Sequence, residues 1–256
     1  MIPSNEFTEF SVKYNVPITT IERDYVQNCI LKYLDKPYLV LKGGTGIKKM
    51  YFKDYRFSDD LDFTLTDQIN ANQITKLFSE IIREIYQEYG ISFQNNIKLR
   101  EIKTGFRFAL YFQIKSSLLS LKFDLTKSEY EKILLPIKKL SVLNPYSEEI
   151  IATVQSYALE EIMAEKIRSV FQRTRPRDVY DIVQIAGDCN KNQIEEILSE
   201  KMDSKNVKYD INDLINRKKD YKFAWNNSLK TLMTEIPDFD YFFDETVSIL
   251  KIYSII

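Results

Sequence analysis

The stretch covering residues 39–66 constrains the fold of this chain more than any other part. It opens on an apolar run typical of a buried strand, followed directly by Lys-Gly-Gly-Thr at residues 42–45. A second strand is predicted at residues 60–65, where Asp60 and Asp62 alternate with apolar residues. Because side chains alternate faces along a strand, we expect both carboxylates on one face and the apolar side chains in a core.

Two neighbouring carboxylates repel each other unless a cation lies between them, and Mg²⁺ commonly binds one or two carboxylates together with phosphate oxygens. The glycine turn, which opens a short helix, would present backbone amides to phosphate groups. Each part alone has a simpler explanation. A Gly-Gly pair after a strand is usually a turn, and alternating aspartates usually mark a solvated face. Together they indicate phosphoryl or nucleotidyl transfer.

Composition excludes several classes of protein. The 256 residues include no histidine, which rules out catalytic triads and zinc sites that use imidazole. The net charge of −1 argues against a uniformly basic nucleic-acid-binding protein but leaves room for a local basic patch. The two cysteines lie far apart and are interpreted as reduced thiols. No apolar run approaches the ~20 residues of a membrane span and no signal peptide is recognised, so we expect a cytoplasmic protein without membrane contact.

The remaining periodicity predicts an α+β fold. Further helices and strands are expected at residues 19–34, 44–53, 67–89, 105–115 and 119–126. Thr19 and Glu22 have the spacing of a capping box at the start of the first helix. On the last strand Asp124 faces away from the apolar side chains, so it is either an exposed strand aspartate or a third carboxylate near the first pair.

The pattern becomes helical after Tyr157 and stays helical. We therefore expect a catalytic domain at residues 1–126, a connecting segment at 127–157 and a helical domain at 158–256. Lys166 lies within an apolar helical stripe. Either its stem passes along the core to bring the ammonium group to solvent, or the ammonium group points into a cleft between domains and neutralises phosphate charge.

A basic run follows Lys166, and a new helix is predicted at Pro176. The arginines of the run are Arg168, Arg173, Arg175 and Arg177. A solvated helix face explains them most simply. Asp178 and Asp181 lie three residues apart on the new helix. The helix dipole favours the first of them, and an i,i+4 pair with Arg177 would accommodate the second.

Four motifs in this order resemble the AbiEii family of nucleotidyltransferase toxins, which occur in bacterial abortive-infection and type IV toxin–antitoxin systems and belong to the polymerase-beta-like nucleotidyltransferase superfamily. The motifs are Lys42-Gly43-Gly44-Thr45, Arg56-Phe57-Ser58-Asp59-Asp60-Leu61-Asp62-Phe63, Leu159-Glu160-Glu161-Ile162-Met163-Ala164-Glu165-Lys166-Ile167 and Arg177-Asp178-Val179-Tyr180-Asp181. The resemblance covers roughly residues 17–185, with Gly46 where relatives often carry alanine. It implies a nucleotidyltransferase fold with a small mixed β-sheet flanked by helices, followed by an α-helical domain.

The resemblance also implies roles for individual residues. The nucleotide triphosphate would be bound by Lys42, Gly43, Gly44, Thr45, Ser58 and Lys166. The metal ion, Mg²⁺ or alternatively Mn²⁺, would be held by Asp60, Asp62 and Asp124. These three aspartates, together with Lys166, Asp178 and Asp181, form the expected catalytic set. The arginines at 168, 173, 175 and 177 could bind nucleic-acid phosphates.

The expected activity is transfer of a nucleoside monophosphate from an NTP to an acceptor hydroxyl, with RNA and particularly a tRNA 3′ end as acceptor. As a toxin the chain would be paired with a cognate antitoxin protein. Three alternatives stay open. The acceptor could be a protein, the reaction could transfer only the γ-phosphate, or the chain could be a catalytically silent module that binds nucleotide, RNA or a partner.

Overall fold

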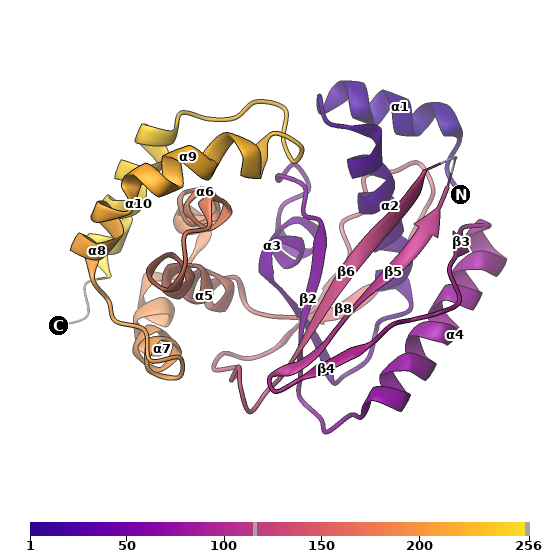
Figure 1. Ribbon diagram of the computed structural model, residues 1–256, viewed down its shortest axis with the longest axis horizontal. Helices are drawn as coiled ribbons and strands as arrows, with labels where there is room; N and C mark the ends of the chain where they lie inside the picture. Colours follow the sequence, from indigo (N-terminus) through magenta and orange to yellow (C-terminus); the bar gives the residue numbers. More distant parts are fainter. Residues whose placement is uncertain (115–116, 254–256) are drawn as a thin grey trace. The chain divides into compact units, whose positions relative to one another are not determined.

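The structure, a computed structural model, describes residues 1–114 and 117–253 (Figure 1). By its internal contacts the chain divides into two compact units. Unit 1 comprises Met1–Glu131 and Ile137–Tyr157, and unit 2 comprises Lys132–Pro136 and Ala158–Ile256. No helix among the described residues is long and apolar enough to cross a membrane.

Unit 1 is built on a mixed sheet, and its described strands follow the order β3-β5-β6-β2-β1-β8-β7, with β4 beside β5. The strands are β1 (Leu39–Lys42), β2 (Asp60–Leu65), β3 (Ser92–Phe93), β4 (Arg100–Ile102), β5 (Gly105–Gln113), β6 (Leu118–Lys127), β7 (Lys138–Ser141) and β8 (Thr153–Ser156). The β1–β8 and β2–β6 pairs are parallel, whereas the other pairs are antiparallel. The expected mixed sheet is confirmed.

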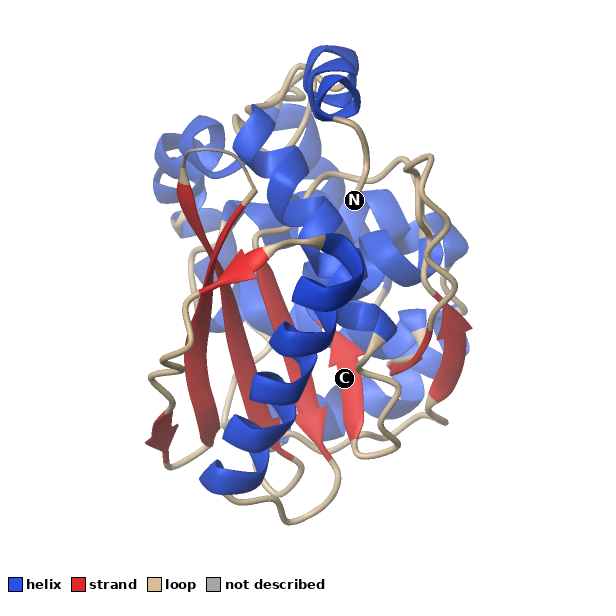
Figure 2. Ribbon diagram, turned by 90° about the vertical axis from the view of Figure 1, so that its right-hand side faces the viewer, coloured by secondary structure: helices blue, strands red, loops and turns tan. Residues whose placement is uncertain are grey.

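Helices cover one face of this sheet. The described helices of unit 1 are α1 (Ser4–Lys13), α2 (Ile18–Lys32), α3 (Gly43–Gly46), which continues as a π-helical turn (Ile47–Tyr51), and α4 (Ala71–Tyr89). Figure 2 shows α4 lying across the strands. Its Phe78 packs edge-on against Phe108 of β5 and Phe123 of β6, whose rings stack on each other at 4.8 Å. The apolar sides of β5 and β6 therefore form the core, as their alternation predicts.

Local signals set the ends of α4 but not the start of α2. Asn70 and Gln73 form a capping box at the start of α4, and Gly90 ends it with φ of 69°. The predicted capping box at Thr19 and Glu22 is wrong. Helix α2 already begins at Ile18, with Pro17 as its N-cap residue and no side-chain cap.

The segment at residues 127–157, interpreted from sequence as a connection, contributes β7 and β8 to the sheet. β8 pairs in parallel with β1, so this part of the chain lies beside the strand that leads into the glycine turn. The proposed domain boundaries stay a prediction. The end of the strand expected at 105–115 lies outside the described residues.

Unit 2 is helical, as expected from Tyr157 onward. Its described helices are α5 (Leu159–Gln172), α6 (Pro176–Ile185), a short 3₁₀ turn (Ala186–Asp188), α7 (Lys191–Asp203), α8 (Ile211–Asn216), α9 (Lys218–Leu229) and α10 (Phe239–Ile252). Trp225 packs against Phe239 and Phe242, and its indole N–H donates to the carbonyl of Pro237 at 2.9 Å. These aromatic side chains form part of the packed core between the helices of unit 2.

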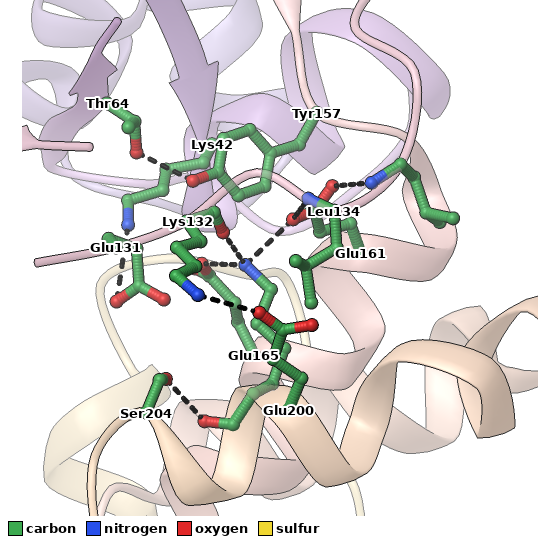
Figure 3. Close-up of polar contacts among 12 residues, drawn as sticks. Lys42, Thr64, Glu131, Lys132, Leu134, Tyr157, Glu161, Glu165, Glu200 and Ser204 are labelled. Carbon is green, nitrogen blue, oxygen red and sulfur yellow. Dashed lines mark hydrogen bonds and ion pairs between the residues drawn. The ribbon is translucent and has the colours of Figure 1, made fainter. Parts of the chain in front are cut away.

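A buried charge cluster binds residues 132–136 to the helices of unit 2 (Figure 3). The Lys201 ammonium group lies 2.7 Å from Glu161 Oε1 and donates to the Lys132 carbonyl at 2.6 Å. The Glu161 carboxylate accepts from the backbone N–H groups of Leu134 and Leu135 at 2.8 and 3.0 Å. Each buried charge thus has hydrogen-bonding partners, as burial requires.

The start of β5 allows only glycine. Gly105 has φ of 151°, and a Cβ atom there would lie 1.9 Å from the carbonyl oxygen of Leu125. We expect Gly105→Ala to lower the free energy of unfolding by about 3 kcal/mol, measured by chemical denaturation. Gly187→Ala is the matched control, because a Cβ atom there meets no atom within 4 Å. Equal stability of the two variants would contradict this prediction.

Candidate functional site

The glycine turn is held against the strand that carries the paired aspartates. Strand β1 ends at Lys42, and Gly43 turns the chain with φ of 72°, a left-handed conformation that favours glycine. A Cβ atom on Gly43 would lie 2.8 Å from Asp62 Oδ2. Two residues further along the turn, the Thr45 hydroxyl donates to the backbone carbonyl of Asp60. The glycine turn is therefore in contact with the strand that carries the two aspartates.

Gly44 is closely packed, and its φ lies outside the left-handed region. A Cβ atom there would lie 2.9 Å from Arg56 Nη2 and 3.2 Å from Ser58 Oγ. Arg56 is only 4 % exposed and donates through Nη1 to the carbonyl of Phe57 at 3.0 Å. Sequence reasoning assigned a role to Ser58 but none to Arg56, although Arg56 opens the second motif. The structure adds it as a cation beside the glycine turn.

Strand pairing places four charged side chains in one row across the sheet. Lys42 of β1 is the register partner of Asp62 of β2, and Asp62 is the partner of Asp124 of β6. Asp124 is in turn the partner of Arg107 of β5. Residues directly opposite each other on paired strands project from the same face. The predicted third carboxylate is therefore the immediate neighbour of Asp62, and Asp60 lies on the same face of β2.

Both ends of this row are cations with defined contacts. Arg107 Nε donates to Asp124 Oδ2 at 2.7 Å, with Arg107 well exposed. Lys42 is nearly buried, and its ammonium group lies 3.9 Å from the carboxylate of Glu131 and 5.5 Å from the centre of the Tyr157 ring. Figure 3 shows Lys42, Glu131 and Tyr157 together. The two like-charged aspartates thus lie between two cations.

The carboxylates suit Mg²⁺ in type, although they are not gathered around one point. Among residues 1–114 and 117–253, no three or more carboxylate or cysteine side chains are placed to hold a metal ion. Asp124, for example, forms an ion pair with Arg107. Magnesium needs only one or two protein carboxylates when phosphate oxygens supply other ligands. Asp60 and Asp62, on one face and beside the glycine turn, fit that requirement.

In unit 2 the structure brings together the three other predicted catalytic residues. The Lys166 ammonium group lies 2.7 Å from Asp178 Oδ1 and 2.8 Å from Asp181 Oδ2. Ser169 Oγ donates to Asp178 Oδ2 at 2.6 Å. Burial raises the pKa of Asp178, but the charges of Lys166 and Arg173 outweigh burial and hold the pKa below its usual value. Asp178 is therefore an ionised partner of Lys166.

The arginine run does not form a continuous exposed strip. Arg168 is 7 % exposed, and its Nη1 lies 3.5 Å from the carbonyl oxygen of Lys201. Its contact with nucleic acid stays a prediction. Arg173 donates to Ser169, and Arg177 donates to the carbonyl of Ser228 at 3.2 Å. Arg173 and Arg175 are exposed, and their role stays a prediction.

Two buried lysines follow the glycine turn and were missed from sequence. Lys49 and Asp24 form an ion pair of 2.8 Å with both side chains 1 % exposed. Burial lowers the pKa of Lys49 to about 8, while Asp24 opposes this shift. Lys48 donates to the carbonyl of Tyr55 and lies 4.2 Å from the centre of the Phe57 ring. No local pattern signalled their burial, which fixes the π-helical turn to its surroundings.

Comparison with known families gives one match, to the model described as nucleotidyl transferase AbiEii toxin of a type IV toxin–antitoxin system, over residues 26–245. The chain belongs to the AbiEii family. The resemblance stated from the motifs is thereby confirmed, and the AbiEii match extends well into the helices of unit 2.

Solved structures share the fold of this AbiEii chain. MenT4, a nucleotidyltransferase toxin from Mycobacterium tuberculosis, matches with a TM-score of 0.67 and 16% identity over 98% of this chain and 90% of its own. JHP933 from Helicobacter pylori matches with a TM-score of 0.63 and 19% identity over 93% of each chain. At these identities the likeness establishes the fold alone. No curated protein matches the sequence.

The contact between Gly43 and Asp62 can be tested directly. Gly43→Ala places a Cβ atom 2.8 Å from Asp62 Oδ2 and strains a left-handed residue, at a cost of about 1–2 kcal/mol in stability. We expect loss of nucleotide binding, measured by calorimetry, in a protein that still folds. Gly90→Ala also has a left-handed φ but no atom within 4 Å, so it serves as the matched control. Unchanged nucleotide binding by Gly43→Ala would contradict the prediction.

The ion pairs of Asp178 predict a pH dependence. Because its pKa in the folded protein lies below the usual 3.8, the unfolded chain binds the proton more readily. Its contribution to stability is therefore present above about pH 4 and is lost as the pH falls through the folded pKa. We expect Asp178→Asn to be less stable at neutral pH by about 2 kcal/mol and to lose less stability on acidification than wild type. Denaturation at several pH values measures both, with exposed Asp67→Asn as control.

Proposed function

We propose that this chain is a divalent-metal-dependent nucleotidyltransferase that moves a nucleoside monophosphate from an NTP to an acceptor hydroxyl. The observation that carries the proposal is the placement of Asp62 beside both Asp124 and the glycine turn. A phosphate-binding turn and carboxylates for a metal ion are the parts that such a transfer needs, because positioning and charge neutralisation carry most of the catalysis. Family membership supports the same activity.

Each candidate site residue of unit 1 has a role in this proposal. Gly43, Gly44 and Thr45 offer backbone groups to the triphosphate, with the hydroxyl of Ser58 beside Gly44. Asp60 and Asp62 would hold the metal ion. When bound, Mg²⁺ or Mn²⁺ would neutralise phosphate charge and activate the acceptor hydroxyl. Asp124 is the third acidic member, and Lys42 is a second cation at the end of β1.

Lys166 remains a nucleotide-binding residue in the proposal, with its ammonium group as the positive charge for phosphate. Its ammonium group is oriented by Asp178 and Asp181. These aspartates therefore act through Lys166 in the proposal. The partners proposed for the chain are an NTP, an RNA acceptor with the tRNA 3′ end favoured, and a cognate antitoxin. The proposed location is the cytoplasm.

The decisive experiment incubates purified protein with Mg²⁺, total RNA and each NTP, labelled in turn at the α- and the γ-phosphate. We expect α-label to enter tRNA-sized RNA. Asp60→Ala and Asp62→Ala should reduce transfer at least 100-fold while leaving the melting temperature within a few degrees, because only the metal site is lost. Asp67→Ala is the matched control, since this aspartate is exposed and follows the same strand.

The outcome also separates the alternatives. Transfer of γ-label alone would identify phosphorylation, and α-label on protein would identify a protein acceptor. Nucleotide binding without any transfer would identify a silent binding module. Full activity of either aspartate variant would overturn the metal assignment.

A further inference from the structure

The sheet of unit 1 has one covered and one open face at β4, β5 and β6. The covered face carries the phenylalanines that pack against α4. The open face carries exposed polar side chains, among them two arginines, a lysine and a tyrosine. These are Arg100 of β4, Arg107 and Tyr111 of β5, and Lys122 of β6, here called the basic sheet face.

Like charges lie side by side on the basic sheet face, and a bound anion would reduce their repulsion. Arg100 and Arg107 lie directly opposite each other on antiparallel strands, and like charges in this position destabilise a sheet. Arg107 is balanced by Asp124 at 2.7 Å. Arg100 and Lys122 form no ion pair with any residue in the ranges 1–114 and 117–253. Two cations on an open face are therefore without a described acidic partner.

The same strands lead to the candidate site. Arg100, Arg107, Asp124 and Asp62 are successive register partners on β4, β5, β6 and β2. Lys122 is the register partner of Asp60. Because neighbouring strands lie about 4.8 Å apart, the backbone at Arg100 is about 14 Å from that at Asp62. This distance is within reach of a few nucleotides of an extended strand.

The chemistry of this face fits a phosphodiester backbone. Arginine and lysine bind phosphate oxygens without regard to sequence, and an exposed aromatic ring can stack on a base. Tyr111, 43 % exposed, projects from the same face of β5 as Arg107. Both are on the face that carries the carboxylates, where an acceptor hydroxyl is needed.

We propose that the basic sheet face binds the phosphates of the acceptor RNA and leads its terminal hydroxyl toward Asp62 and Asp124. This inference rests on the proposed function and adds the surface that selects the acceptor.

The test uses the double variant Arg100→Gln/Lys122→Gln, which changes neither a carboxylate nor the arginine bound to Asp124. The matched control is Lys76→Gln/Arg83→Gln on α4, with one exposed lysine and one exposed arginine on the covering helix. A second variant, Arg100→Lys/Lys122→Arg, keeps both charges. Fluorescence anisotropy with labelled tRNA measures binding over a range of salt concentrations, and calorimetry measures NTP binding.

We expect the glutamine variant to bind tRNA at least tenfold more weakly and its salt dependence to fall by about 2 in slope, since each lost phosphate contact lowers the slope by about 1. NTP binding should be unchanged, and the charge-preserving variant should bind tRNA normally. Unchanged tRNA affinity of the glutamine variant, or an equal loss in the α4 control, would overturn the inference. Both results leave the proposed function intact if wild type still labels RNA. Absence of RNA labelling, or label on protein instead, would overturn the RNA acceptor and this surface together.

Discussion

The adjacency of Asp62 and Asp124 on parallel strands is the constraint on which the rest of unit 1 depends. Two carboxylates in direct register repel each other, and the sheet places Lys42 and Arg107 on either side of them. Gly43 leaves the space into which Asp62 projects, and buried Arg56 brings a further cation to the same turn. Glycines, cations and carboxylates thus form one interdependent arrangement, which we propose binds a ligand that carries both positive and negative charge.

In unit 2 the buried charges form groups in which one lysine is paired with two carboxylates. Lys166 is shared by two buried aspartates, and Lys201 is shared by Glu161 and Glu165. Removing one partner from such a group leaves an uncompensated charge, which is why buried ionic groups demand complete sets of partners. The helices of this unit are therefore fixed by specific polar contacts in addition to their apolar core, and the orientation of the Lys166 ammonium group follows from them.

Local pattern predicted much of the fold, and pairing across the chain decided the rest. Alternation along β2 and β6 correctly placed Asp62 and Asp124 away from the core, but only the pairing of these distant strands reveals that they are neighbours. The same limit hid the partnership of Arg107 with Asp124, which joins two strands. Arg168 occurs in a basic run that gives no sign of its burial. The capping spacing at Thr19 was present in sequence, yet the helix begins one residue earlier.

The path of the chain has a consequence for dividing the protein into parts. Residues 132–136 belong to unit 2, although they lie between two segments of unit 1, so the backbone passes from one unit to the other three times. A fragment beginning at Ala158 would lose the carbonyl of Lys132 and the N–H groups of Leu134 and Leu135. Glu161 and Lys201 would then lack these hydrogen-bonding partners. Because each unit is made of two separate segments of the chain, neither can be isolated by one truncation.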